Sequence, residues 1–149
     1  MKGRSYMQAI IRYELVINEA LRSALMLDTP DEQIDEFIRF FGKHIGCDRI
    51  YIFEDNKKEH VTDNTYEWCR QGIESEIDYL QGVDMDIIDW WYKAFDKKKN
   101  VIIRDVETIK NEHVYTYNTL KIQNVKRLVV CPIRYKNEIC LLYTSDAAD

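Results

Sequence analysis

The segment GCDRIYIFEDNKKEHVTDNTYEWC, residues 46–69, contains the pattern that decides the fold. Residues 49–54, RIYIFE, are rich in isoleucine and aromatic side chains, which predicts a β-strand. The polar run at 55–58 predicts a turn, and residues 60–69 predict a second strand that returns beside the first. The segment is therefore expected to form a β-hairpin.

Each strand of this hairpin is expected to have two different faces, because successive side chains of a strand point to opposite sides. On the first strand Ile50 and Ile52 face one way, and Tyr51 and Phe53 face the other. On the second strand one face is expected to carry four residues, namely Thr62, Asn64, Tyr66 and Trp68. The hairpin thus has one face able to meet helices and one rich in aromatic groups.

Two helices are predicted before the hairpin. Residues 6–27 place apolar side chains at intervals of three and four on two faces, so this helix can be buried on two sides. Thr29 is a suitable cap and Pro30 suits the first position of a second helix, which continues to about Ile45. Gly46 is expected to end it.

Helices and strands also alternate after the hairpin. An amphipathic helix is predicted at 86–95, a short strand at 101–103 and a weakly signalled helix at 112–121. A strand follows at 125–133, and Ile139 begins another after a hairpin turn. This order predicts helices packed on an antiparallel sheet.

Composition disfavours several classes of protein. The chain has 149 residues, which suits one domain, and 46% of them are hydrophobic. The formal net charge is -5 and the 21 basic residues are scattered, which disfavours nucleic-acid binding. No uncharged apolar stretch is long enough to span a membrane. The four cysteines are widely spaced, which favours free thiols in the cytoplasm over a zinc site or a disulfide framework.

Several short strings resemble the GAF domain family. Residues 46–54 look like the first strand of a GAF domain, and residues 64–69, NTYEWC, resemble the second strand of a bacterial subgroup. Residues 100–106 resemble the third strand, and residues 120–132 resemble the step from helix to strand that follows it. The resemblance covers roughly residues 30–139. It implies an α/β (α+β) fold with a GAF-like central antiparallel sheet, N-terminal helices on one face and a ligand pocket on the other.

The last ten residues resemble something else. Residues 140–149, CLLYTSDAAD, look like translated sequencing-adapter DNA, and we expect them to be a non-native tail. Residues 1–28 are then a connector or dimerisation helix, and residues 29–139 are an incomplete, C-terminally truncated GAF-like sensor domain. Loss of the natural final strand and helix predicts a marginally stable chain that is prone to aggregate.

The resemblance also implies a function. GAF domains of this kind are sensory modules upstream of outputs such as GGDEF diguanylate cyclases or histidine kinases. We expect a domain without catalytic activity of its own that binds an unidentified small molecule and controls an absent output, with a diguanylate cyclase as the first choice. The N-terminal helix is expected to form a homodimer. Two alternatives stay open: a ligand-free dimerisation spacer, and a GAF-like thiol (methionine sulfoxide) reductase.

The ligand site is expected on the aromatic face of the sheet and under the helix that covers it. Asn64 is the sharpest candidate, because an amide inside a sheet needs hydrogen-bond partners. An apolar pocket with a few polar groups is what a small ligand needs. The expected ligand-binding residues are Tyr51, Phe53, Asn64, Tyr66, Trp68, Trp91, Arg104, Leu128 and Val130.

Other chemistry has weaker support. The chain lacks the NKFDE signature of cyclic-nucleotide GAF domains, and no bilin-type cysteine motif surrounds His113. Asp84, Asp86 and Asp89 fit helix capping better than metal binding. Cys69 and Cys131 could approach each other as a thiol pair, but they are more simply explained as small core residues. The cofactor is therefore unknown, and no metal, haem or bilin signature is seen in the sequence.

Overall fold

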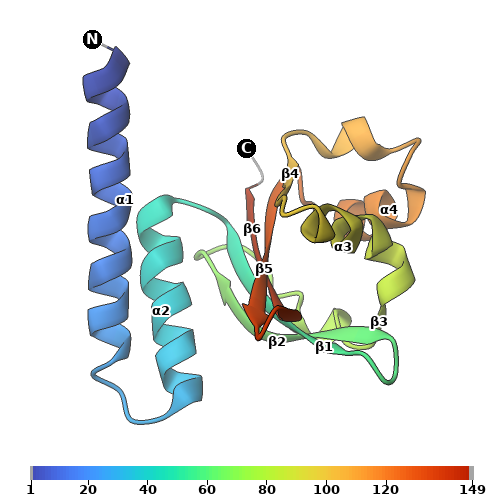
Figure 1. Cartoon of the computed structure of the whole chain (residues 1–149), viewed down its shortest axis with the longest axis horizontal. Helices are drawn as coiled ribbons and strands as arrows, with labels where there is room; N and C mark the ends of the chain where they lie inside the picture. Colours follow the sequence, from blue (N-terminus) through green and yellow to red (C-terminus); the bar gives the residue numbers. More distant parts are fainter. Residues whose placement is uncertain (1, 148–149) are drawn as a thin grey trace. The chain divides into compact units, whose positions relative to one another are not determined.

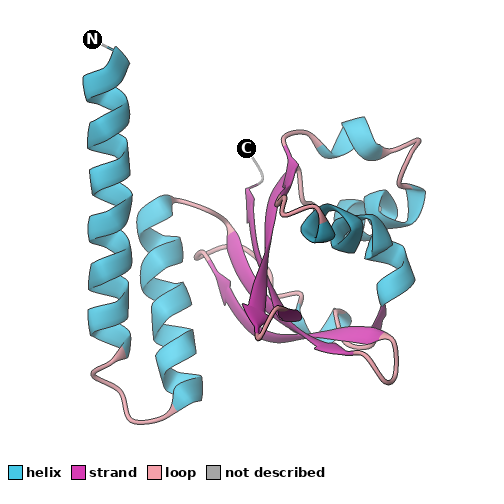
Figure 2. Cartoon of the chain, in the orientation of Figure 1, coloured by secondary structure: helices cyan, strands magenta, loops and turns pink. Residues whose placement is uncertain are grey.

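The computed structural model describes the backbone of residues 2–147 and the side chains of residues 3–139. The chain divides into two compact units, one ending at Gly46 and the other beginning at Cys47. The first is all helical, whereas the second contains a sheet with short helices (Figures 1 and 2). Within the described residues, no helix is long and apolar enough to cross a membrane.

The first unit is a hairpin of α1 (Lys2–Ala24) and α2 (Pro30–Ile45). Its turn is determined by local chemistry. Thr29 and Glu32 form a reciprocal capping box, in which the Thr29 side chain accepts from the Glu32 N–H and the Glu32 carboxylate accepts from the Thr29 N–H. Gly46 ends α2 in the left-handed region, with φ +74°. The caps predicted from the sequence are thus confirmed.

The second unit is built on a six-stranded sheet with the order β3-β2-β1-β6-β5-β4, in which every pair is antiparallel. This confirms the predicted α+β architecture with a central antiparallel sheet. The strands are β1 (Arg49–Asn56), β2 (Val61–Cys69), β3 (Val83–Asp84), β4 (Val101–Ile103), β5 (Arg127–Tyr135) and β6 (Glu138–Ala147).

Short helices connect these strands, and α3 and α4 lie on one side of the sheet (Figure 1). Their apolar side chains form a core with β4 and β5 in which Phe95 and Val130 are fully buried. The helical segments of this unit are η1 (Ile77–Tyr79), η2 (Met85–Ile88), α3 (Asp89–Asp96), η3 (Val106–Ile109) and α4 (Val114–Ile122).

The last strand differs from the expectation. A strand starting at Ile139 was expected to break at the tail, but β6 continues to Ala147 and pairs with β1 on one side and β5 on the other. The backbone of residues 140–147 therefore occupies the centre of the sheet. The foreign origin of residues 140–149 stays a prediction.

The pairing of β1 with β2 contains a one-residue irregularity. Ile52 lies opposite Tyr66, whereas the next residue, Phe53, lies opposite Asn64, so Thr65 is an extra residue on β2. Such a bulge reverses the alternation of the strand that carries it. The prediction that Thr62, Asn64, Tyr66 and Trp68 share one face is therefore wrong, since only the first two share the face of Phe53.

Candidate ligand-binding site

A cavity of about 50 Å³ lies between the sheet and the helices that cover it. The floor comes from β1, β2 and β5, and the cover comes from η2, α3 and α4. The lining residues are Tyr51, Phe53, Thr62, Leu80, Val83, Ile87, Ile88, Trp91, Thr116, Thr119, Leu120, Gln123 and Leu128. The wall is almost entirely apolar, and none of these residues carries a charge.

The hydroxyl groups around the cavity already donate to protein acceptors. Thr116 Oγ1 donates to the carbonyl of Ile87 at 2.6 Å and accepts from Trp90 Nε1 at 3.0 Å. Thr62 Oγ1 donates to the Glu54 carbonyl at 3.2 Å, and Thr119 donates to its own helix. These hydroxyls therefore have no proton left for a ligand.

Two buried side chains, in contrast, lack partners within the described structure. Trp91 lines the cavity, is 6% exposed, and its Nε1 has no acceptor. Asn64 is 2% exposed, and neither Oδ1 nor Nδ2 makes a hydrogen bond. It lies on the cavity face of β2, opposite Phe53 and two residues from Thr62. An unpaired buried polar group costs roughly 1–3 kcal/mol, so both side chains need an explanation.

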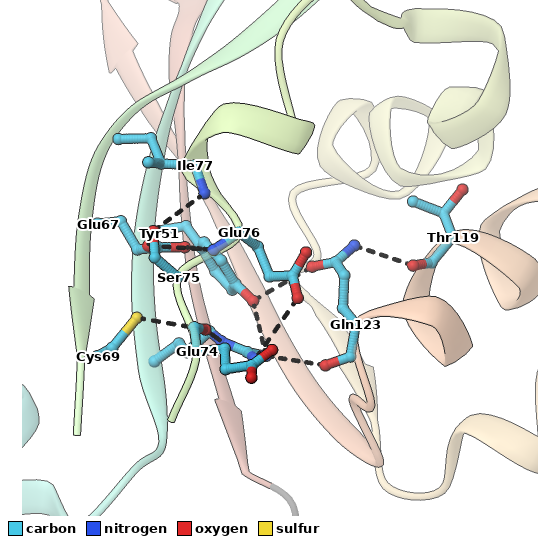
Figure 3. Close-up of polar contacts among 10 residues, drawn as sticks. Tyr51, Glu67, Cys69, Glu74, Ser75, Glu76, Ile77, Thr119 and Gln123 are labelled. Atoms are coloured by element: carbon cyan, nitrogen blue, oxygen red, sulfur yellow. Dashed lines mark hydrogen bonds and ion pairs between the residues drawn. The ribbon is translucent and has the colours of Figure 1, made fainter. Parts of the chain in front are cut away.

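A buried polar network joins the sheet to α4 beside the cavity (Figure 3). Arg49 donates to the Gln123 carbonyl at 3.0 Å and to the Glu74 carbonyl at 2.9 Å. The Tyr51 hydroxyl donates to Gln123 Oε1 at 3.2 Å, and Gln123 Nε2 donates to the Thr119 carbonyl at 3.0 Å. This network holds the end of α4 against β1.

Arg49 is also paired with Glu76 at 3.8 Å, and both side chains are largely buried. Burial raises the pKa of Glu76, an effect that the positive charge of Arg49 opposes. The sequence analysis missed Arg49, Glu76 and Gln123 as part of the site. One signal was available, because Arg49 shares the face of Tyr51 and Phe53, and an arginine on a buried strand face requires partners.

The structure separates the predicted ligand-binding residues into groups. Tyr51, Phe53, Trp91 and Leu128 line the cavity, and Asn64 lies on the same sheet face. Val130 is fully buried in the core on the face of Leu128, but it does not line the cavity.

Three predicted residues lie elsewhere. Tyr66 and Trp68 pair with Ile52 and Ile50, on the opposite face of the sheet, because of the bulge at Thr65. Arg104 is exposed just beyond β4, beside the acidic side chains of η3 and its cap. The structure therefore does not bring Tyr66, Trp68 or Arg104 to the cavity.

Cys69 and Cys131 do not form a reactive pair. Burial and the nearby Glu67 carboxylate raise the pKa of Cys69 to about 12, so the thiol stays protonated at neutral pH. Burial also raises the pKa of Cys131. Cys69 pairs with Arg49, on the cavity face, whereas Cys131 belongs to the face opposite Val130. The expectation that these two thiols could approach each other is wrong.

One group of ligating atoms lies on the surface. His60, Asp84 and Asp86 bring one atom each within 4.8 Å of the others, and all three residues are exposed. His60 Nε2 lies 2.9 Å from Asp86 Oδ1, and Asp84 caps η2 by accepting from the Asp86 N–H. Capping by Asp84 was predicted and is confirmed.

Comparison with known proteins gives structural neighbours only. No family model and no curated protein matches the chain. The phycoerythrobilin-bound GAF domain from a cyanobacterial phytochrome is 18% identical, with a TM-score of 0.71 over 93% of this chain and 83% of that one. NreA from Staphylococcus aureus, mutated in its nitrate-binding site, is 16% identical, with a TM-score of 0.61 over 80% of this chain and 86% of that one.

A third neighbour is an enzyme. The free methionine-R-sulfoxide reductase from Neisseria meningitidis, solved with its substrate, is 9% identical, with a TM-score of 0.66 over 91% of this chain and 73% of that one. At such identities these similarities concern the fold. The element order, the antiparallel sheet and these neighbours agree, and the chain has the fold of a GAF domain.

Proposed function

We propose that this chain is a sensory input module that binds a small molecule in the cavity under α3 and α4. The module itself is not catalytic, and it regulates an output domain of a longer cytoplasmic signalling protein. Family resemblance makes a GGDEF diguanylate cyclase the first choice for that output. Fold alone is a poor guide to function, so the argument depends on the site.

One observation carries the proposal: Trp91 lines a cavity, Asn64 lies on the sheet face that forms its floor, and these two buried side chains have polar atoms without a protein partner. Native interiors satisfy nearly all buried polar groups. Asn64 on β2 and Trp91 on α3 break that rule, while the threonines that line the cavity obey it. A bound molecule that supplies the missing hydrogen bonds removes the cost of burying these groups.

Two features of the chain could transmit ligand binding to an output domain. Gln123 connects the cavity wall to the Arg49 network, so a ligand that moves α4 changes buried contacts on β1.

Separately, α1 exposes a row of apolar side chains, spaced three or four residues apart, that suits a second copy of the chain. Its members are Tyr6, Ile10, Tyr13, Ile17 and Leu21. We propose a homodimer through this row, which a ligand regulates only if it prefers one of two states.

Native mass spectrometry of the gently purified chain tests the proposal. We expect a noncovalent small molecule on the wild-type protein and its loss from Asn64→Leu. The matched control is Trp68→Phe, which alters the same strand on the opposite face and should retain the molecule. Only the apo mass in every preparation, from cells grown under several conditions, would contradict ligand binding.

The ligand-free spacer has one observation in its favour. A cavity of about 50 Å³ is small beside the 150 Å³ that holds benzene, so side chains fill most of the space. This reading predicts an apo mass together with a stable dimer. The reductase alternative is disfavoured, because Cys69 has a strongly raised pKa and Cys131 lies on the opposite face.

A further inference from the structure

The cavity excludes charged ligands. Every residue that lines it is neutral, and the nearest buried cation, Arg49, is paired with Glu76. A charge placed there would lose its hydration without gaining a counter-charge. The occupant is therefore neutral.

The cavity also limits the size of its ligand. About 50 Å³ is one third of the volume of a cavity that accommodates benzene. At about 10–15 Å³ for each water-sized site, the space suits a group of roughly four heavy atoms. The phycoerythrobilin bound by the cyanobacterial phytochrome domain is far larger than this space.

The two adjacent tryptophans reveal what the ligand must offer. Trp90 Nε1 donates to Thr116 at 3.0 Å, whereas Trp91 Nε1 is buried at the cavity with no acceptor. An indole N–H can only donate, so the ligand must present an acceptor to Trp91. Asn64 has both a donor and an acceptor unpaired, and its complement is a group that both accepts and donates.

A carboxamide is the small neutral group that meets these requirements. We propose that the cavity recognises a small primary amide, whose oxygen accepts from Trp91 Nε1 and from Asn64 Nδ2 and whose NH₂ donates to Asn64 Oδ1. This inference depends on the proposed function, because it names the ligand class of the same cavity.

Three isosteric probes separate the contributions of the ligand's oxygen and NH₂ group to binding. Acetamide offers the oxygen and the NH₂, acetone offers the oxygen alone, and isobutene offers neither. In an NMR titration of the full chain, we expect acetamide to bind about tenfold more tightly than acetone, and acetone more tightly than isobutene. The indole N–H signal of Trp91 should move downfield with the first two probes only.

Matched variants show which residue causes each difference in affinity between the probes. Asn64→Leu should erase the preference for acetamide over acetone, and it should remain folded because it removes an unpaired amide. Trp91→Phe should reduce the preference for acetone over isobutene. Trp90→Phe is the control, since its N–H already has a partner, and it should keep both preferences.

Two results would overturn the amide proposal. Isobutene could bind as tightly as acetamide, or an ordered water on Trp91 could resist displacement by acetamide at saturating concentration. If a molecule still co-purifies with the chain, the sensor proposal survives and only the ligand class is wrong. If all probes fail and the native mass is apo, both proposals fail.

Discussion

The helical hairpin of residues 2–46 and the sheet unit that begins at Cys47 satisfy their polar groups in different ways. In the hairpin, Thr29 caps α2 by exchanging hydrogen bonds with Glu32, three residues away, and these bonds are exposed. In the sheet unit, Arg49 is buried and bonds to Gln123, 74 residues away. Hydrogen bonds between residues close in sequence can be predicted from the sequence. Hydrogen bonds between residues far apart in sequence form a site only once the chain has folded.

The largest effect that we expect comes from ending the chain at Ile139. β6 lies between β1 and β5, so its removal splits the sheet and leaves two strands with unpaired edges. Cooperative thermal unfolding, followed by circular dichroism, should be lost. A chain that lacks residues 2–11 is the control, since these α1 residues are exposed wherever burial is described, and its sheet unit should still melt cooperatively.

Replacing Arg49 by methionine should give the next largest effect. The change leaves Glu76 without its ion-pair partner, and it removes the donor to the buried Gln123 carbonyl and to the partly buried Glu74 carbonyl. We expect a loss of about 3 kcal/mol in the free energy of unfolding, measured with urea. The exposed Arg104→Met should change it by less than about 0.5 kcal/mol. Equal effects would mean that the buried network does not stabilise the sheet unit.

Removing the Thr29 cap of α2 should lower the free energy of unfolding by less than the Arg49 substitution does. Thr29→Ala removes the oxygen that accepts from the Glu32 N–H, and we expect a loss of about 1 kcal/mol. Thr29→Ser keeps that oxygen and should recover most of the stability. If Thr29→Ser is as unstable as Thr29→Ala, the threonine methyl group rather than the capping box stabilises this turn.

The smallest effect that we expect is on the exposed pair of His60 and Asp86. The hydrogen bond to Asp86 raises the pKa of His60 above its usual value of 6.5. A raised folded pKa stabilises the protein below the unfolded pKa, and this stabilisation is lost as pH rises through the folded value. NMR titration should show the raised pKa and its return toward 6.5 in Asp86→Asn. Asp78→Asn, on η1, should leave it unchanged.

Much of the fold was predictable because its signals are local. The caps at Thr29 and Gly46, the strand pattern of residues 49–54 and the turn after it all depend on a few neighbouring residues. Asn64 was a candidate from the sequence because an amide inside a sheet needs hydrogen-bond partners, and its role in ligand binding stays a prediction. Its lack of a protein partner could not be predicted, since that depends on every chain segment around it.

The sequence by itself determined the order of the main helices and strands, both ends of α2 and the aromatic face of β1. Tertiary structure decided which candidates reach the cavity. One extra residue at Thr65 turned Tyr66 and Trp68 to the other face, and folding brought Gln123 to Arg49. The physical reason is that propensity and capping act within a turn or two, whereas strand register and buried polar pairing are set by residues far apart in the chain.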